Sequence, residues 1–166
     1  MNLYLIRHAI AVDRDVVDVI TDAARELTPE GVEKFRRSAR ALRRSAVEPR
    51  EIWTSPLLRA RQTAEILSDE LKDRPPVIVV KALEPSGHFE EVIERLEQNS
   101  KLDAVALVGH EPYLGEITSL LIGGPRNRAI PIKKGGAACI EIDDFRPPYH
   151  GELRWLITPR QMGMMT

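Results

Sequence analysis

The sequence opens with a short apolar run that ends in two basic side chains. Residues 3–6, Leu-Tyr-Leu-Ile, lack the alternating polar side chains of a strand at the surface. Arg7 and His8 follow directly. Such a run is typical of a strand buried on both faces inside a parallel sheet. Ligands of open α/β sheets lie at the carboxyl ends of the strands. We therefore expect Arg7 and His8 to face a crevice.

The same arrangement recurs later in the chain. Residues 104–108 are again uniformly apolar and lead into Gly109 and His110. A shorter strand is predicted at 51–54, and Arg59 follows it in the first turn of a predicted helix, where backbone amides attract anions. If the strands are parallel, Arg7, His8, Arg59 and His110 converge on one edge of the sheet.

Strands and helices alternate through most of the sequence. Periodicity predicts strands at 3–6, 51–54, 77–80, 104–108, 138–143 and 152–157, and helices starting near 29, 57, 89 and 114. This order predicts a three-layer α/β/α fold with a mainly parallel sheet of about six strands and an antiparallel hairpin near the C-terminus. We expect one domain that spans 1–166.

Two helix starts have a recognisable local pattern. Thr28-Pro29-Glu30 combines a capping hydroxyl, a proline suited to the first helical position and an acid suited to the positive end of the dipole. Ser55-Pro56 repeats the pattern, so we predict a capped helix there as well. The arginines at 36–44 lie opposite an apolar stripe and are interpreted as a solvated helix face.

Charge and cysteine content limit the partners. Twenty-four basic and 25 acidic residues give a formal charge of −1, so no overall field favours nucleic acid or an anionic membrane. The lone Cys139 cannot form an intramolecular disulfide, and no histidine or cysteine has metal-ligand spacing. We expect a cytoplasmic protein that needs no metal or cofactor and contains no membrane span.

Two arginines and two histidines at one edge suit phosphoryl chemistry. Guanidinium groups match phosphoryl oxygens in pairs. A neutral imidazole can attack phosphorus and carry the phosphoryl group covalently, while the cationic surround stabilises the transition state without a metal.

The residues that carry this chemistry resemble a known family. Leu5-Ile6-Arg7-His8-Ala9 resembles the RHG signature of the histidine phosphatase superfamily, which has a phosphoglycerate mutase-like fold. Further similarities to that family are found, in its order, at 25–31 (R-x-L-T-x-x-G), 55–64 and 108–110. The length, the Leu83-Glu84-Pro85 loop and the tail from Trp155 to Met162 are similar to the SixA-type phosphohistidine phosphatases.

The resemblance implies a role for each matching residue. His8 would be the nucleophile, and Arg7, Arg59 and His110 would hold the phosphoryl oxygens, with Arg25 as a further contact. Glu84 falls near the position of the family's general acid, which SixA-type members often lack. Two departures stand out: Ala9 replaces the signature glycine and requires a negative φ, and Arg14 replaces the asparagine of the mutase branch.

Three functions are compatible with these residues. The first is a phosphatase for phosphohistidine on a signalling or phosphotransfer protein. Only the loops at 9–27, 82–88 and 123–136 are available to cover the site, and an open site admits a phosphorylated side chain on a protein surface. The second is a phosphatase for a small phosphate ester, with Glu84 as acid. The third is a non-catalytic phosphate-binding module. The basic loop at 126–134 either docks a substrate or is only solvated.

Overall fold

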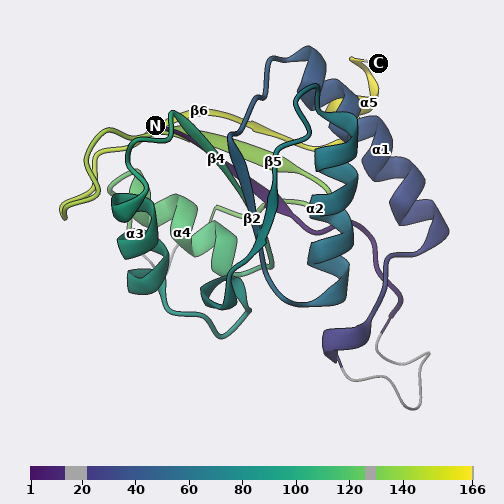
Figure 1. Ribbon diagram of the computed structural model, residues 1–166, viewed down its shortest axis with the longest axis horizontal. Helices are drawn as coiled ribbons and strands as arrows, with labels where there is room; N and C mark the ends of the chain where they lie inside the picture. The colour runs from purple at the N-terminus through teal and green to yellow at the C-terminus, as the bar shows by residue number, and fades with distance from the viewer. Residues whose placement is uncertain (14–21, 126–129, 166) are drawn as a thin grey trace.

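Six strands form one sheet through the middle of the molecule (Figure 1). The computed structural model describes residues 1–13, 22–125 and 130–165. The sheet order is β3-β2-β4-β1-β5-β6. The strands are β1 (Asn2–Arg7), β2 (Glu51–Thr54), β3 (Val77–Val79), β4 (Ala104–Gly109), β5 (Ala137–Glu141) and β6 (Glu152–Ile157). Strands β1 to β4 run parallel, whereas β5 is antiparallel to β1 and β6 is antiparallel to β5.

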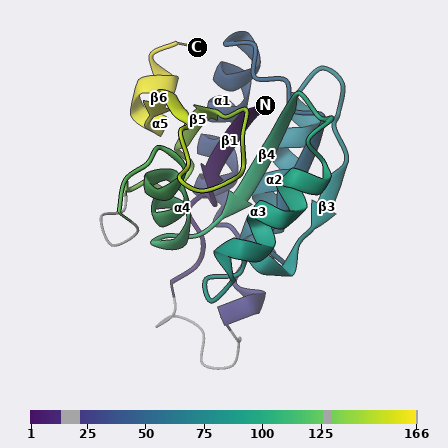
Figure 2. The same ribbon diagram turned by 90° about the vertical axis from the view of Figure 1, so that its left-hand side faces the viewer.

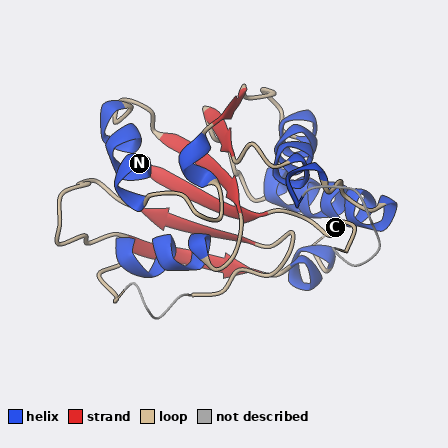
Figure 3. Ribbon diagram, turned by 90° about the horizontal axis from the view of Figure 1, so that it is seen from below, coloured by secondary structure: helices blue, strands red, loops and turns tan. Residues whose placement is uncertain are grey.

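Helices cover both faces of this sheet. The helices α1 (Pro29–Arg44), α2 (Leu58–Glu70) and α5 (Pro159–Gly163) lie on one side, and α3 (Phe89–Gln98) and α4 (Tyr113–Leu121) lie on the other (Figure 3). Figure 2 looks onto the side of α3 and α4, with α1 and α2 behind the sheet. The predicted three-layer α/β/α fold, its mainly parallel sheet and its C-terminal hairpin are confirmed.

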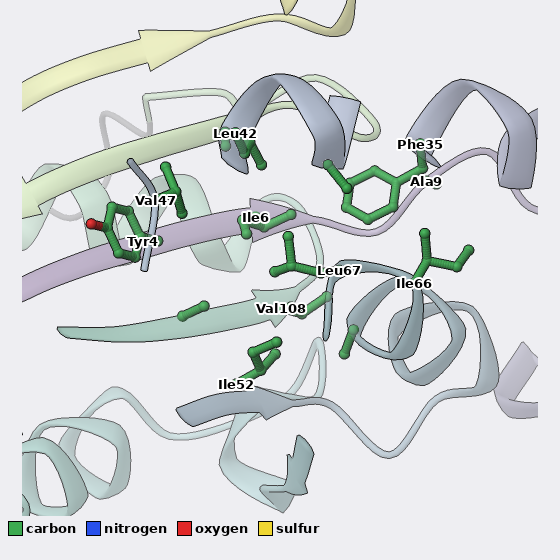
Figure 4. Packing of buried hydrophobic residues seen from close by; sticks show 14 of the residues in the cluster. Tyr4, Ile6, Ala9, Phe35, Leu42, Val47, Ile52, Ile66, Leu67 and Val108 are labelled. Atoms are coloured by element: carbon green, nitrogen blue, oxygen red, sulfur yellow. The ribbon is translucent and has the colours of Figure 1, made fainter. Parts of the chain in front are cut away.

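Burial on both faces explains the apolar run in β1. Tyr4 and Ile6 belong to the core under α1 and α2, whereas Leu3 and Leu5 belong to the core under α3 and α4. Figure 4 shows the first of these cores, in which Ile6 of β1 packs with Phe35, Leu42 and Leu67 of the helices. Burying each large aliphatic side chain contributes about 1.5–3 kcal/mol, so a strand packed on both sides is a strong anchor for the residues after it.

The two predicted helix starts turn out differently. The hydroxyl of Thr28 accepts a hydrogen bond from the amide of Gly31 at 2.9 Å, and Pro29 is the first residue of α1, as predicted. The prediction for Ser55-Pro56 is wrong, because α2 begins at Leu58 and no side chain caps it. The Ser55 hydroxyl lies 2.9 Å from Nε2 of His110, which follows β4, instead.

The arginine-rich face of α1 is engaged in ion pairs at the surface. Arg36 and Arg40 both contact the carboxylate of Glu70 on α2, and Arg37 pairs with Glu33 one turn away. The contacts with Glu70 connect α1 to α2, and all three pairs agree with the interpretation of a solvated helix face.

Two short helical turns and α5 have no counterpart in the prediction. The turns are η2 (Asp22–Ala24) and η3 (Lys81–Leu83). Helix α5 begins with a capping box between Thr158 and Gln161 and buries Met162 in the core under α1. Cys139 is buried in that same core, and burial raises the pKa of its thiol to about 11. Within the described ranges, no helix has the length and apolarity of a membrane span.

Candidate active site

The register of three parallel strands brings distant residues to one edge of the sheet. Arg7 pairs with Gly109, and Thr54 pairs with Val108, so β1, β2 and β4 end at the same level. The amide of His8 then donates to the carbonyl of Gly109 at 3.0 Å. The residues that follow each strand therefore leave the sheet side by side.

The two imidazoles predicted to meet do so. The ring centroids of His8 and His110 are 5.1 Å apart, and the rings are tilted by 53°. His8 is 6% exposed and His110 is 2% exposed. Both rings are thus shielded from solvent and close enough to contact one phosphoryl-sized group between them.

The hydrogen bonds of His8 define its tautomer. Its Nδ1 lies 2.7 Å from the carbonyl oxygen of Ala9. A carbonyl oxygen can only accept, so Nδ1 carries the proton and the neutral ring keeps a lone pair on Nε2. Burial lowers the pKa of His8 to about 4, and the positive charges of Arg59 and Arg7 act in the same direction. His8 is therefore neutral at pH 7.

His110 contacts a serine hydroxyl through one ring nitrogen and leaves the other without a partner in the described chain. Its Nε2 lies 2.9 Å from the hydroxyl oxygen of Ser55, which also accepts from the amide of Leu57. The Ser55 hydroxyl can donate its proton to Nε2, and in that tautomer the ring proton is on Nδ1. That Nδ1 is buried and has no partner within the described chain. Burial, followed by the charges of His8 and Arg59, lowers the pKa of His110 to about 3.

Arg7 and Arg59 are the two guanidinium groups beside the imidazoles. Arg7 donates from Nη1 to the carbonyl of Ile132 at 3.0 Å, and its buried Nε has no partner among the described residues. Arg59 lies in the first turn of α2 and is 4% exposed. Its two terminal nitrogens donate to the carbonyl and the carboxylate of Asp22, at 2.7 and 3.0 Å.

Asp22 connects Arg25 to this group. One carboxylate oxygen of Asp22 accepts from Arg59, and the other accepts from Nη1 of Arg25 at 2.8 Å. Arg25 also donates from Nε to the carbonyl of Val12. Sequence reasoning missed Asp22, because an acid in a polar loop has no distinguishing local pattern.

A threonine hydroxyl joins the His8 segment to α2. The Thr63 hydroxyl accepts from the amide of Ala9 at 3.1 Å and donates to the carbonyl of Arg59 at 2.7 Å. The nucleophile loop and the helix that carries Arg59 are thereby held at a fixed distance. Sequence reasoning did not single out Thr63 either, although it lies in the family-like segment at 55–64.

Glu84 follows a backbone segment that lies beside the end of β4, since a Cβ added at Gly109 would be 3.5 Å from the carbonyl oxygen of Leu83. It follows η3, is half-buried, and lines a separate hollow with Ser86 and His88. Within the described ranges no hydrogen bond or ion pair joins its carboxylate to His8, His110 or either arginine. Its role as general acid stays a prediction.

Together these side chains present a neutral nucleophile to an anion. His8 Nε2 supplies the lone pair, and Arg7, Arg59 and His110 supply buried donors around it. Such a group of donors, with cationic guanidinium groups on Arg7 and Arg59, suits a phosphoryl group, whose transition state spreads negative charge over its equatorial oxygens.

Comparisons with known proteins agree with this geometry. The family model of the histidine phosphatase superfamily (branch 1) matches residues 3–85, half of the chain. This chain belongs to the histidine phosphatase superfamily. An uncharacterised protein of Picosynechococcus sp. is 37% identical over 96% of this chain and 98% of its own length. The phosphohistidine phosphatase SixA of Escherichia coli K12 is 26% identical over 99% of this chain and 98% of its own length.

Solved structures of two phosphatases share the fold. A structure of the protein histidine phosphatase SixA complexed with tungstate has a TM-score of 0.83, with 26% identity over 96% of this chain and 98% of that one. The alpha-ribazole phosphatase from Shigella flexneri has a TM-score of 0.77, with 20% identity over 96% of this chain and 97% of that one. The phosphoglycerate mutase-like fold expected from the motifs agrees with these neighbours.

The departure from the superfamily signature at Ala9 is accommodated. Ala9 is buried, and the non-glycine residues with positive φ in the described chain are Ala46 and Arg74. The backbone at Ala9 therefore needs no glycine. Arg14, the other departure, lies outside the described residues, as do Arg126 and Arg128 of the basic loop.

Proposed function

We propose that this protein is a phosphohistidine phosphatase that removes phosphate from a phosphorylated signalling or phosphotransfer protein through a covalent intermediate on His8. The observation that carries the proposal is the neutral His8 with a free Nε2, held 5.1 Å from His110 among buried cationic donors. Similarity to SixA over nearly the whole chain supports the substrate class. That relative was solved with tungstate, itself a tetrahedral oxyanion.

The proposed reaction has two displacement steps. His8 Nε2 attacks phosphorus, its lone pair forms the new P–N bond, and the P–N bond to the substrate imidazole breaks. The leaving imidazole takes a proton from water. A water molecule then attacks the phosphoryl group on His8, which releases inorganic phosphate and restores the neutral ring. Arg7, Arg59 and His110 Nδ1 would hold the equatorial oxygens in both steps, so the proposal includes no metal or cofactor.

The direct test is to trap the intermediate. A histidine-phosphotransfer domain labelled with radioactive phosphate is mixed with the enzyme and quenched rapidly. We expect base-stable label on the wild-type protein and none on His8→Ala, while His88→Ala, a change at an exposed histidine, keeps the label. A wild-type protein that never acquires label, or label that persists in His8→Ala, would contradict the proposal.

A small-ester phosphatase is the second candidate. The observation in its favour is structural likeness to the alpha-ribazole phosphatase, which at 20% identity supports the fold only. A poor leaving alkoxide needs an acid more than an imidazole does, so Glu84→Gln should lower ester cleavage by about 10²-fold and phosphohistidine cleavage far less. Parallel rates on the phosphorylated domain and on a panel of esters separate the two functions.

We also propose a cytoplasmic location. A single buried cysteine suits a reducing compartment, where phosphotransfer domains would meet the enzyme.

A further inference from the structure

A second cavity lies beside the catalytic group. It is bounded by the segment after β1, the first turns of α1 and the start of α5, and its volume is about 650 Å³. Binding pockets for ligands commonly have volumes of about 300–1,000 Å³. Ile10 and Pro159, both half-buried, contribute apolar surface to its walls. The cavity is therefore large enough for one or two side chains of a partner and offers them an apolar floor.

The rim of this cavity is strongly basic. Lys34, Lys133, Lys134 and Arg160 line it, and no aspartate or glutamate among the described residues does. Lys34 pairs with Glu30 at 2.5 Å. The other three are exposed and form no ion pair with any described residue. In a chain with a formal charge of −1, this local excess of positive charge is complementary to an acidic partner.

Backbone contacts connect the cavity to the catalytic residues. Arg7 and Ala9, on either side of the nucleophile, line its inner wall. The amide of Gly135 donates to the carbonyls of Arg7 and His8, at 3.0 and 3.1 Å. The turn that carries Lys133 and Lys134 is thus fixed to the catalytic strand. A molecule whose phosphoryl group reaches His8 has its neighbouring groups within reach of this rim.

We propose that the cavity is a docking subsite for an acidic, partly apolar segment of the phosphorylated protein that flanks its phosphohistidine. The inference rests on the proposed function and adds the chemical character of the partner. An apolar side chain of that segment lies on Ile10 and Pro159, and its carboxylates face Lys133 and Arg160. A small phosphate ester has no groups that extend so far.

The test separates docking from chemistry. The double variant Lys133→Ala/Arg160→Ala removes two exposed rim charges and leaves His8, Arg7 and Arg59 intact. We expect the KM for a phosphorylated histidine-phosphotransfer domain to rise roughly five- to tenfold, because two rim ion pairs are lost. Hydrolysis of free phosphohistidine should be unchanged. The matched control, Lys72→Ala/Lys101→Ala, removes two exposed charges elsewhere and should leave both substrates unaffected.

Each outcome decides between the two proposals. An unchanged KM for the phosphorylated domain, while the wild type cleaves it, overturns the docking subsite alone. An equal loss on free phosphohistidine also overturns it, since the rim would then act on the chemistry or on a small ligand. A wild-type enzyme that leaves the phosphorylated domain untouched overturns the proposed function, and the docking subsite with it. Matching melting temperatures show that the variants are folded.

Discussion

The carbonyl oxygen of Ala9 determines which nitrogen of His8 is nucleophilic. Because it accepts a hydrogen bond from Nδ1, the lone pair is on Nε2. Burial lowers the pKa of His8 to about 4, so the ring stays neutral at pH values well below 6.5. Both properties come from the chain around His8, not from the residue itself. The motif can predict that His8 is the nucleophile, but the choice of nitrogen depends on a backbone direction that no motif specifies.

Asp22 offers a test at this scale. Its carboxylate lies on the guanidinium of Arg59 and repels any anion bound there. We expect Asp22→Asn, which keeps the shape and an accepting oxygen, to lower the inhibition constant of inorganic phosphate or vanadate about tenfold, since about 1–2 kcal/mol of repulsion is removed. Steady-state inhibition measures the constant.

The control for this change is Asp13→Asn, the same loss of charge at an exposed residue of the preceding segment. It should leave the inhibition constant unchanged. Weaker inhibition in Asp22→Asn would show that the carboxylate holds Arg59 in place instead of competing with the anion.

Among the structural elements, α1 begins against the segment that follows His8. A Cβ added at Gly31 would lie 2.1 Å from the carbonyl oxygen of Ile10, and that oxygen is held by the amide of Thr28 at 3.0 Å. The start of α1 and the catalytic segment are therefore in backbone contact. This accounts for the glycine in the family-like segment at 25–31.

The contact predicts a cost for a single methyl group. Gly31→Ala should lower the free energy of unfolding by about 2–3 kcal/mol and reduce turnover, because Ile10 must shift and His8 lies two residues away. Denaturation in urea measures the first effect. The control is Gly163→Ala in α5, where an added Cβ meets nothing within 4 Å and should change stability by less than about 0.5 kcal/mol. Equal stabilities of the two variants would contradict the prediction.

The elements that the sequence could predict are those with a strong local signal. All six strands were predictable because each has a run of apolar or alternating residues. Helix α5 was not, since five residues are too few to show a period. The supposed cap at Ser55 was wrong because its hydroxyl contacts His110, a partner 55 positions away. Asp22 and Thr63 also act through contacts with residues far along the chain, so their place in the site could not be predicted from the sequence.

For the whole molecule, the two buried histidines make stability depend on pH. In the unfolded chain both rings take up protons near pH 6.5, whereas in the folded chain the pKa values are about 4 for His8 and about 3 for His110. Below pH 6.5 the unfolded state binds more protons, so the free energy of unfolding falls as the pH falls toward 4.

The expected loss between about pH 7 and about pH 5 is roughly 2 kcal/mol per histidine. Urea denaturation at the two pH values measures it. The variant His8→Gln/His110→Gln should lose much less over the same interval, since neither site titrates. A similar loss in both proteins would assign the acid sensitivity to other groups.

The place of β1 in the middle of the sheet also governs when the catalytic centre can be completed during translation. Asn2 of β1 pairs with Ala104 of β4 and with Glu141 of β5. Both partners are synthesised long after β1 has left the ribosome. Until then its amides and carbonyls remain open to other chains or to chaperones. A nascent polypeptide halted before β4 would therefore carry the nucleophile without His110 beside it.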